Sequence, residues 1–191
     1  MIVGVLGLQG AVREHVHSLT RLDVETRVVK RVDDLDGLDA LVLPGGESST
    51  ISLLAENGIL DRLREMAKGG LPMFGTCAGM ILLAREAEGR ATPGLDAIDI
   101  TVSRNASGRQ VDSFETTLAI DEIGPDVPAV FIRAPYATRI GPGVTPMAHH
   151  SDFVVMAREG RVLVSSFHPE LTDDLRVHRY FIEELVKKEE N

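Results

Sequence analysis

The sequence contains a single cysteine and no tryptophan in 191 residues, and it has no apolar run long enough to span a bilayer. One cysteine excludes both an internal disulfide framework and a cysteine-based zinc site. Basic residues are also scarce, because 20 lysines and arginines face 29 aspartates and glutamates and leave a formal net charge of −9. This charge argues against nucleic acid or an anionic membrane as the main partner.

The remaining composition is that of an ordinary soluble globular protein, with 43% hydrophobic and 26% charged residues. Its length suits one domain with a sizeable core, so residues 1–191 are expected to form a single unit. Residues 1–8 lack the basic region of a signal peptide and are needed for a strand. We therefore expect a cytoplasmic protein, in a compartment where a lone thiol stays reduced.

Apolar runs alternate with amphipathic segments through the first half of the chain. The strands expected from this pattern lie at residues 2–8, 26–32, 39–43 and 72–76. Helices are expected at 11–22, in pieces between 51 and 66, and after residue 77. The alternation predicts an α/β fold, a three-layer doubly wound and mostly parallel sheet with helices on both faces. Such folds place their sites at the carboxyl ends of the strands.

The second half changes character, since strands follow one another without long helices between them. They are expected at 98–104, 113–120, 129–133, 153–157 and 161–165. These segments predict extra antiparallel or mixed strands late in the chain. A last helix is expected from an N-cap at Thr172 to Lys187-Lys188, whose charges suit its negative end.

The only cysteine stands in the frame Gly75-Thr76-Cys77-Ala78-Gly79, between a short apolar strand and an apolar helix. This frame is the thiol version of a nucleophile elbow, in which glycines leave room for a sharp turn from strand to helix. The turn exposes the sulfur at a helix N-terminus, where amide groups and the helix dipole favour the thiolate. The alternative is an inert cysteine in an apolar core.

A candidate base for this nucleophile is His168, which follows the strand expected at 161–165. If that strand lies beside the strand preceding Cys77, the imidazole can reach the sulfur. Glu170 is two residues further on, and in an extended segment the two side chains project to the same side. Nucleophile, base and orienting carboxylate are the parts of a catalytic triad. The alternative is a histidine that caps a helix beside a surface glutamate.

The other five histidines have simpler interpretations. His15 and His17 lie on the first expected helix, where most histidines are exposed. His149 and His150 stand in a turn-like stretch, and because neighbouring side chains point apart we expect no metal site there. His178 is expected on the charged face of the last helix.

The segment Pro44-Gly45-Gly46-Glu47-Ser48 follows the third expected strand. Its two glycines allow the backbone to approach a ligand closely, and its amide groups are suited to stabilise an oxyanion. A tight turn is the alternative, because glycine pairs are common in turns. A phosphate-binding loop is excluded, since the segment lacks the lysine that such a loop requires.

In their order, the cysteine frame, the Gly45-Gly46 loop and His168-Pro169-Glu170 resemble the class I, triad-type glutamine amidotransferases. Further motifs resemble one family among them, the glutaminase subunits of pyridoxal 5′-phosphate synthase, and the resemblance covers essentially the whole chain. These motifs are residues 4–10, 104–115, 131–135 and 168–172. The resemblance implies a flavodoxin-like fold of class I amidotransferases. It also implies hydrolysis of L-glutamine to L-glutamate and ammonia, with no cofactor and no metal ion.

The resemblance further implies roles for individual residues. Cys77 would form a γ-glutamyl thioester, His168 would transfer protons, and Glu170 would orient His168. The positions that match glutamine-binding residues of the family are Gly46, Glu47, Ser48, Arg104, Ile132 and Arg133. The oxyanion hole would come from backbone amides of Gly45, Gly46 and Ala78. An arginine suits the α-carboxylate of glutamine because its planar fork donates two parallel hydrogen bonds.

In that family the ammonia passes through a channel to a separate synthase subunit, which builds pyridoxal 5′-phosphate from a pentose phosphate and a triose phosphate. The resemblance therefore implies a large hetero-oligomer with up to twelve copies of each subunit, and low activity until the synthase docks. One departure from the family is Ser107, which stands where a bulky aromatic residue is expected, and it puts in doubt the packing of its loop and the contact of that loop with the synthase.

Three other interpretations remain open. One is an amidotransferase subunit of another pathway, such as imidazole glycerol phosphate synthesis, although residues 108–115 and Ala134-Pro135 argue against it. Another is a non-catalytic module that binds glutamine or a partner, although such a scaffold would usually have lost one of Cys77, His168 and Glu170. The third is a cysteine hydrolase that acts on another amide.

Overall fold

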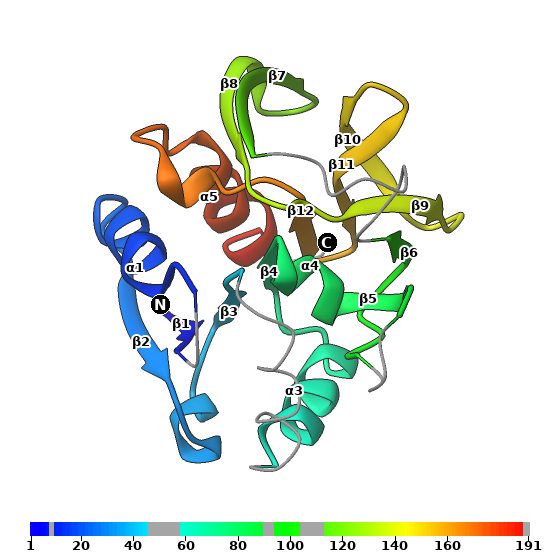
Figure 1. Cartoon of the computed structure of the whole chain (residues 1–191). Coiled ribbons are helices and arrows are strands. Elements are labelled where there is room, and N and C mark those ends of the chain that lie inside the picture. Colours follow the sequence, from blue (N-terminus) through cyan, green and yellow to red (C-terminus); the bar gives the residue numbers. More distant parts are fainter. Residues whose placement is uncertain (8–9, 46–57, 90–93, 104–112, 189–191) are drawn as a thin grey trace.

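The computed structural model describes residues 1–7, 10–45, 58–89, 94–103 and 113–188 (Figure 1). Within these residues the main sheet has ten strands in the order β2-β1-β3-β4-β12-β11-β9-β6-β5, with β10 paired to β11. The first five strands in this spatial order, β2, β1, β3, β4 and β12, are parallel to one another. They are β1 (Ile2–Leu6), β2 (Glu25–Val29), β3 (Ala40–Leu43), β4 (Met73–Thr76) and β12 (Val162–Ser165). This is the order of flavodoxin-like sheets.

The other half of the sheet is mostly antiparallel. It contains β11 (Phe153–Glu159), β9 (Tyr136–Ile140), β6 (Ile98–Ser103), β5 (Ala84–Ala87) and β10 (Thr145–His150). β11 runs antiparallel to β12, β9 and β10, whereas β5 and β6 run parallel to each other. A separate antiparallel ribbon, β7 (Phe114–Ile120) with β8 (Gly124–Phe131), lies at the top of Figure 1.

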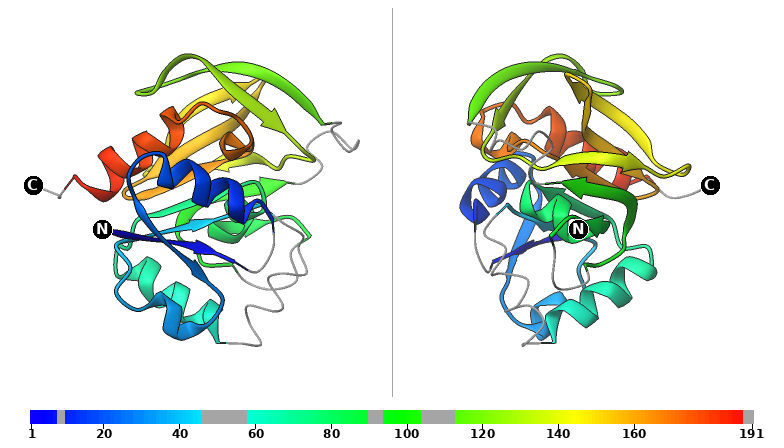
Figure 2. Two further views of the ribbon diagram at one scale, coloured as in Figure 1. Left: turned by 90° about the vertical axis from the view of Figure 1, so that its left-hand side faces the viewer. Right: turned by 45° about the vertical axis from the view of Figure 1, so that its right-hand side comes forward.

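Helices cover both faces of the parallel half (Figure 2). One face packs against α1 (Val12–Thr20), α5 (Arg176–Tyr180), its π-helical continuation η3 (Phe181–Val186) and the β7–β8 ribbon. The other packs against η1 (Val32–Leu35), α3 (Ile59–Lys68) and α4 (Ala78–Leu83). β3 contributes Ala40 and Val42 to the first core and Leu41 and Leu43 to the second. Because both faces are buried, the strand is apolar at every position.

The predicted doubly wound α/β class with late antiparallel strands is confirmed. The elements β5, β9 and β10 are missing from the sequence-based prediction. β5 follows α4 directly, and its residues Ala84-Arg85-Glu86-Ala87 are all good helix formers, which indicates a continued helix when the segment is taken alone. It also forms the edge of the sheet, and its four residues are too few to show a clear period of two.

The last helix begins later than predicted, at Arg176 rather than just after Thr172. The Thr172 hydroxyl donates to the Pro169 carbonyl and accepts the amide of Asp174, so it stabilises a turn. The Asp174 carboxylate accepts the amide of Arg176 at 2.9 Å and pairs with its guanidinium at 2.6 Å. Asp174 therefore stabilises the positive end of the helix, as expected, but from two residues before its first residue.

β12 lies beside β4 in parallel register, with Ser165 opposite Thr76. The amide of Cys77 continues this pairing, donating to the Ser165 carbonyl at 2.8 Å. The segments that follow the two strands therefore leave the sheet at the same edge.

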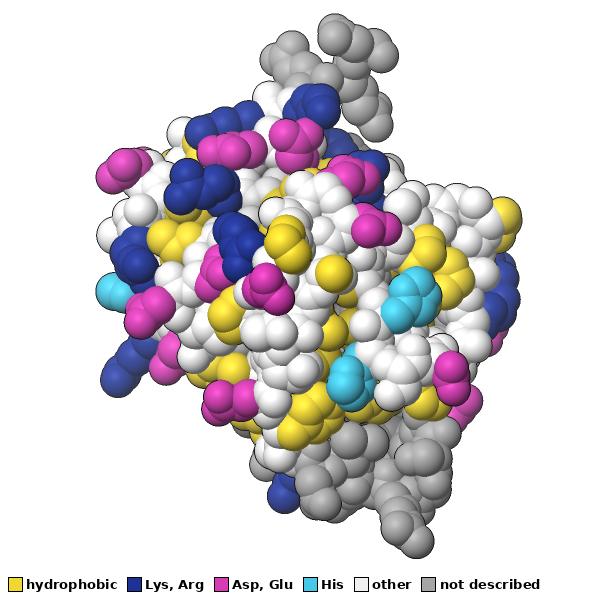
Figure 3. Space-filling view, turned by 90° about the horizontal axis from the view of Figure 1, so that it is seen from above, with side chains coloured by type: hydrophobic (Ala, Val, Ile, Leu, Met, Phe, Trp, Pro, Cys, Tyr) yellow, Lys and Arg dark blue, Asp and Glu magenta, His cyan; other side chains and the backbone are white. Residues whose placement is uncertain are grey.

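Surface features add two observations. Acidic and basic side chains are mixed across the face seen from above, with hydrophobic side chains scattered between them (Figure 3). Among the helices of the described ranges, none combines the length and the hydrophobicity that a bilayer crossing requires.

Candidate active site

Cys77 lies at the turn between β4 and α4, with φ 49° and ψ −105°. A positive φ is costly for a residue with a side chain, so the surrounding structure must impose it. The two glycines of the frame explain how. A Cβ on Gly75 would lie 2.6 Å from the backbone of Gly79, and a Cβ on Gly79 would overlap the carbonyl oxygen of Leu43. The frame therefore lets β4, α4 and β3 meet without side chains between them.

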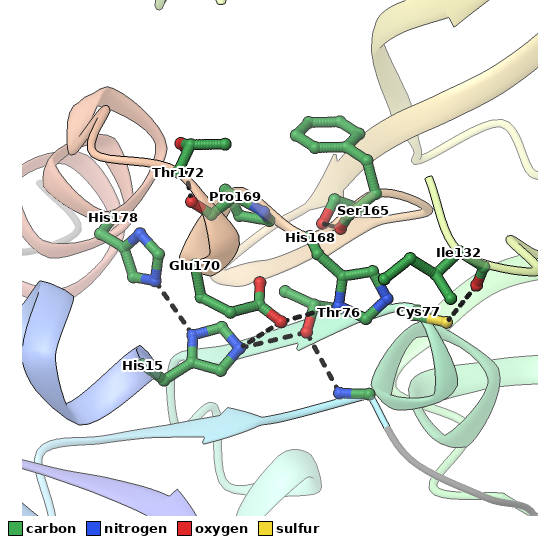
Figure 4. A network of polar contacts seen from close by, with 12 residues as sticks. His15, Thr76, Cys77, Ile132, Ser165, His168, Pro169, Glu170, Thr172 and His178 are labelled. Atoms are coloured by element: carbon green, nitrogen blue, oxygen red, sulfur yellow. Dashed lines mark hydrogen bonds and ion pairs between the residues drawn. The ribbon is translucent and has the colours of Figure 1, made fainter. Parts of the chain in front are cut away.

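His168 follows β12 and reaches the same edge of the sheet. Its amide donates to the Val130 carbonyl at 2.8 Å, which ties the segment to β8. Its ring Nδ1 donates to Oε1 of Glu170 at 2.7 Å, and its other ring nitrogen turns toward Cys77 (Figure 4). A Cβ on Gly45 would lie 2.7 Å from the ring and 3.1 Å from the Cys77 Cβ. Gly45 therefore packs against both side chains.

Glu170 is buried, with only 4% of the residue exposed. The expectation of an extended segment is wrong, because Pro169–Leu171 forms a short 3-10 turn, η2. The contact predicted between the two side chains is nevertheless present, since the turn folds the carboxylate back under the imidazole. Proline at the start of such a turn fixes φ and lacks an amide that would need a partner.

The pKa values of the pair move in opposite directions. Burial lowers the pKa of His168, but hydrogen bonds to Cys77 and Glu170 and their charges outweigh burial and raise it from 6.5 to about 10. Burial raises the pKa of the Glu170 carboxyl, but His15 and His168 outweigh burial and hold it well below its usual value. The arrangement therefore keeps a proton on the imidazole and a negative charge on the carboxylate.

His15 and His178 are misplaced by the sequence-based prediction, because both are fully buried. His15 Nδ1 lies 3.0 Å from His178 Nε2, and His15 Nε2 lies 3.1 Å from the Thr76 hydroxyl and 3.5 Å from Glu170 Oε1. A signal for this burial exists in the sequence. His15 shares a helical face with Leu19, and His178 lies three and four residues before Phe181 and Ile182, on the apolar face of the last helix.

His178 gives the structure a testable pH dependence. Burial, followed by nearby His15, lowers the pKa of its imidazole from 6.5 to about 3. Between these two pKa values the unfolded chain binds a proton at His178 and the folded chain does not. The contribution of the neutral His178 to the unfolding free energy is therefore complete above pH 6.5 and is lost as the pH falls toward 3. Glutamine does not titrate. In a His178→Gln variant, the decrease of unfolding free energy on acidification should therefore be smaller by on the order of a few kcal/mol.

Chemical denaturation of the two proteins from about pH 7 to about pH 4 measures this difference. The exposed His17, changed to glutamine, is the matched control and should leave the curve as it is in the unaltered protein. Equal slopes for the His178 variant and the unaltered protein would contradict the assignment.

The backbone amides predicted for the oxyanion hole differ in whether they already donate a hydrogen bond. The Gly45 amide donates to the Thr76 hydroxyl at 3.2 Å, so it is engaged. Ala78 is the first residue of α4, and such an amide has no partner within its own helix. Gly46 lies outside the described residues.

One of the predicted glutamine-binding residues, Ile132, lies beside the sulfur, and Arg133 follows it in the chain. Cys77 Sγ is 3.9 Å from the Ile132 carbonyl, and Ile132 is 40% exposed. Arg133 is exposed and has φ 47°, so the backbone is strained directly after the carbonyl that faces the thiol. The other predicted positions, Glu47, Ser48 and Arg104 together with Gly46, lie outside the described residues, as does Ser107.

His149 and His150 do not occupy a turn, since they end strand β10. The His150 ring packs against Phe114 and Phe131, with ring centroids 4.9 and 5.5 Å away. His150 is therefore part of the packing beneath the β7–β8 ribbon. In the part of the chain that the structure describes, no group of three histidine, cysteine or acidic side chains is arranged to hold a metal ion.

With this geometry in place, comparison with known proteins is decisive. Residues 5–187 match the SNO glutamine amidotransferase family. This chain is a member of that family. It is 54% identical over 189 residues to the pyridoxal 5′-phosphate synthase subunit PdxT of Carboxydothermus hydrogenoformans, covering 98% of this chain and 99% of the relative. It is 52% identical over 193 residues to PdxT of Pelotomaculum thermopropionicum, covering 100% and 98%.

Solved structures agree with the family assignment. A crystal structure described as a glutamine amidotransferase superposes with a TM-score of 0.89 at 49% identity, covering 96% of this chain and 98% of the other. A chain of PurLQS from Thermotoga maritima superposes with a TM-score of 0.73 at 16% identity and shares the fold. The class I amidotransferase fold that the sequence motifs imply is thereby confirmed.

Proposed function

We propose that this member of the SNO family is the glutaminase subunit of a pyridoxal 5′-phosphate synthase and hydrolyses L-glutamine to L-glutamate and ammonia. The observation that carries the proposal is the placement of the only thiol of the chain. It sits on a strained elbow at a helix N-terminus, against an imidazole that a buried carboxylate holds by a 2.7 Å hydrogen bond. The relatives named as subunits of that synthase match the chain over nearly its whole length.

The reaction follows from the positions of these side chains. The Cys77 thiolate attacks the side-chain carbonyl carbon of glutamine, and the His168 imidazolium, which carries the proton taken from the thiol, passes that proton to the amide nitrogen. The C–N bond breaks, ammonia leaves, and a γ-glutamyl thioester remains on the sulfur. His168 then takes a proton from an attacking water molecule and returns it to the sulfur as the C–S bond breaks and glutamate leaves. Glu170 holds the imidazole in place through both steps.

The tetrahedral intermediates carry an oxyanion that needs amide donors. The Ala78 amide at the start of α4 is suited to this role, with the helix dipole behind it. The Gly45 amide serves only after it leaves the Thr76 hydroxyl, and Gly46 remains a predicted donor. A resting site with an engaged Gly45 amide supports low activity before a synthase subunit docks.

Glutamine is held by its backbone groups on the exposed side of the sulfur. The guanidinium of Arg133 suits the α-carboxylate, and the Ile132 carbonyl suits an ammonium or amide donor. Gly46, Glu47, Ser48 and Arg104 remain predicted contacts. In the assembly we propose, a synthase subunit covers this side and receives the ammonia. It forms a cytoplasmic complex with up to twelve copies of each subunit.

Ammonia release from glutamine tests the proposal, measured with the purified chain alone and after addition of a pyridoxal 5′-phosphate synthase subunit. We expect little release from the chain alone and a large rise on mixing. High release from the chain alone would keep the glutaminase and contradict gating by the partner. No release in either case would contradict the proposed reaction.

Glu170 should matter for turnover more than for glutamine binding. Replacing it with glutamine keeps the volume but removes the charge that holds the imidazolium, so we expect kcat to fall about a hundredfold and KM to change less than about threefold. Steady-state kinetics in the presence of the synthase subunit measures both. Glu14, exposed on α1, offers the control substitution to glutamine and should change neither. An unchanged kcat for the Glu170 variant would remove Glu170 from the triad.

A further inference from the structure

A pair of buried histidines lies behind the proposed triad and takes no part in the reaction described above. His15 comes from α1 and His178 from α5, and both rings are fully buried. Burying two imidazoles is costly unless their polar atoms have partners. Their contacts lead toward the catalytic groups.

His15 bridges the two halves of the site (Figure 4). Its Nε2 lies 3.5 Å from Oε1 of Glu170, the same oxygen that accepts from His168. The same Nε2 lies 3.1 Å from the Thr76 hydroxyl, which in turn accepts the amide of Gly45. One ring nitrogen thus faces both the orienting carboxylate and the hydroxyl that holds a predicted oxyanion-hole amide.

The partners determine where the protons lie. A carboxylate only accepts hydrogen bonds, so the His15 nitrogen that faces Glu170 must carry the hydrogen. When His15 is neutral, its Nδ1 accepts from His178 Nε2, which lies 3.0 Å away. The buried Nδ1 of His178 has no hydrogen-bond partner among the described residues, as suits an acceptor better than a donor. His178 therefore orients the His15 ring so that Nε2 donates toward Glu170.

We propose that His15 is a positioning residue for glutamine hydrolysis. It fixes the Glu170 carboxylate under His168, and through Thr76 it holds the Gly45 amide in its resting orientation. The inference rests on the proposed function. It adds a residue from the first helix that touches neither the sulfur nor the substrate, and that couples the triad to the loop after β3.

An asparagine and a glutamine at position 15 separate this role from simple packing. Glutamine places its amide where the Nε2 hydrogen lies and can still donate to Glu170 and Thr76. Asparagine is shorter, places its amide near Nδ1, and keeps contact with His178 alone. We expect His15→Asn to lower kcat about tenfold to a hundredfold and His15→Gln to lower it less than about threefold, with KM nearly unchanged in both. His17→Asn, on the exposed face of α1, is the matched control.

The pH profile gives a readout that a packing role would not move. The ionisable groups facing His15 are Glu170 from η2 and His178 from α5, with His168 and Cys77 beyond Glu170. His15 lowers the pKa of the Glu170 carboxyl against the effect of burial, so losing its donor raises that pKa. The acidic limb of the kcat/KM profile should therefore move to higher pH in His15→Asn and move less in His15→Gln, which keeps the hydrogen bond but not the charge of His15.

A second readout does not depend on glutamine. Cys77 is the only cysteine, so alkylation by iodoacetamide reports on that one thiol in the chain alone. The acidic limb of its rate against pH should shift in His15→Asn as the kinetic limb does. Wild-type kinetics and pH profiles in both folded variants would overturn the role of His15. If the unaltered protein releases no ammonia from glutamine but the alkylation limb still shifts in His15→Asn, the proposed function is overturned. The positioning of the triad by His15 then still stands.

Discussion

Ammonia release from glutamine should fall by at least about a thousandfold when Cys77 is replaced with alanine, because the nucleophile is lost. No other residue of the chain carries a thiol that could take over. The side chain is small and partly exposed, so its loss leaves the elbow intact. Alanine also keeps the positive φ of the site about as well as cysteine does. Fold and docking should therefore survive a change that removes turnover.

The comparison needs two measurements on the same protein. Thermal unfolding should give a midpoint close to that of the unaltered chain, and binding to the synthase subunit should have a similar affinity. Activity close to that of the unaltered protein would show that Cys77 is not the nucleophile. Loss of activity together with loss of folding would show that the elbow depends on the thiol itself.

Replacing Gly79 with alanine should damage the protein more than any surface change, although it adds one methyl group. The new Cβ would overlap the carbonyl oxygen of Leu43, a backbone atom at the end of β3. Neither α4 nor β3 can yield without disturbing a fully buried core, so we expect a loss of about 3 kcal/mol or more in unfolding free energy. Cys77 would be displaced with α4, and turnover should fall as well.

Gly69→Ala is the matched control, since this glycine ends α3 with φ −75° and a Cβ there would lie 3.4 Å from the nearest carbonyl oxygens. That variant should be as stable as the unaltered protein or slightly more stable. Urea denaturation of both variants measures the contrast. Equal stability of the Gly79 and Gly69 variants would show that the close approach of α4 to β3 does not require glycine.

Much of the fold follows from local signals in the sequence. The strands β1, β3, β4 and β12 are apolar at consecutive positions because the sheet is covered on both faces, and this pattern is legible without a structure. β10 cannot be predicted from the sequence, since it contains Pro146, ends in two histidines and pairs with β11 in an irregular register. Its place is determined by pairing with β11, which residue types alone do not encode.

The site divides in the same way. The role of Cys77 is predictable because the glycines around it have a local steric cause. The pairing of His168 with Glu170 is predictable because residues two positions apart in the sequence stay close in space. His15 and Thr76 are harder, since their meeting depends on how α1 packs against the carboxyl end of β4. The helical face that His15 shares with Leu19 indicates burial, whereas the general tendency of helix histidines to be exposed predicts the opposite.

The central claim is that Cys77 attacks the side-chain carbonyl group of glutamine in a site built from His168 and Glu170. A diazoketone analogue of glutamine, added to the complex with the synthase subunit, tests this claim most directly because it alkylates a nucleophile that recognises glutamine. Peptide mass spectrometry should find one equivalent on Cys77, with ammonia release lost in proportion and glutamine protecting against both. Labelling of another residue, or full activity after Cys77 has been labelled, would contradict the account.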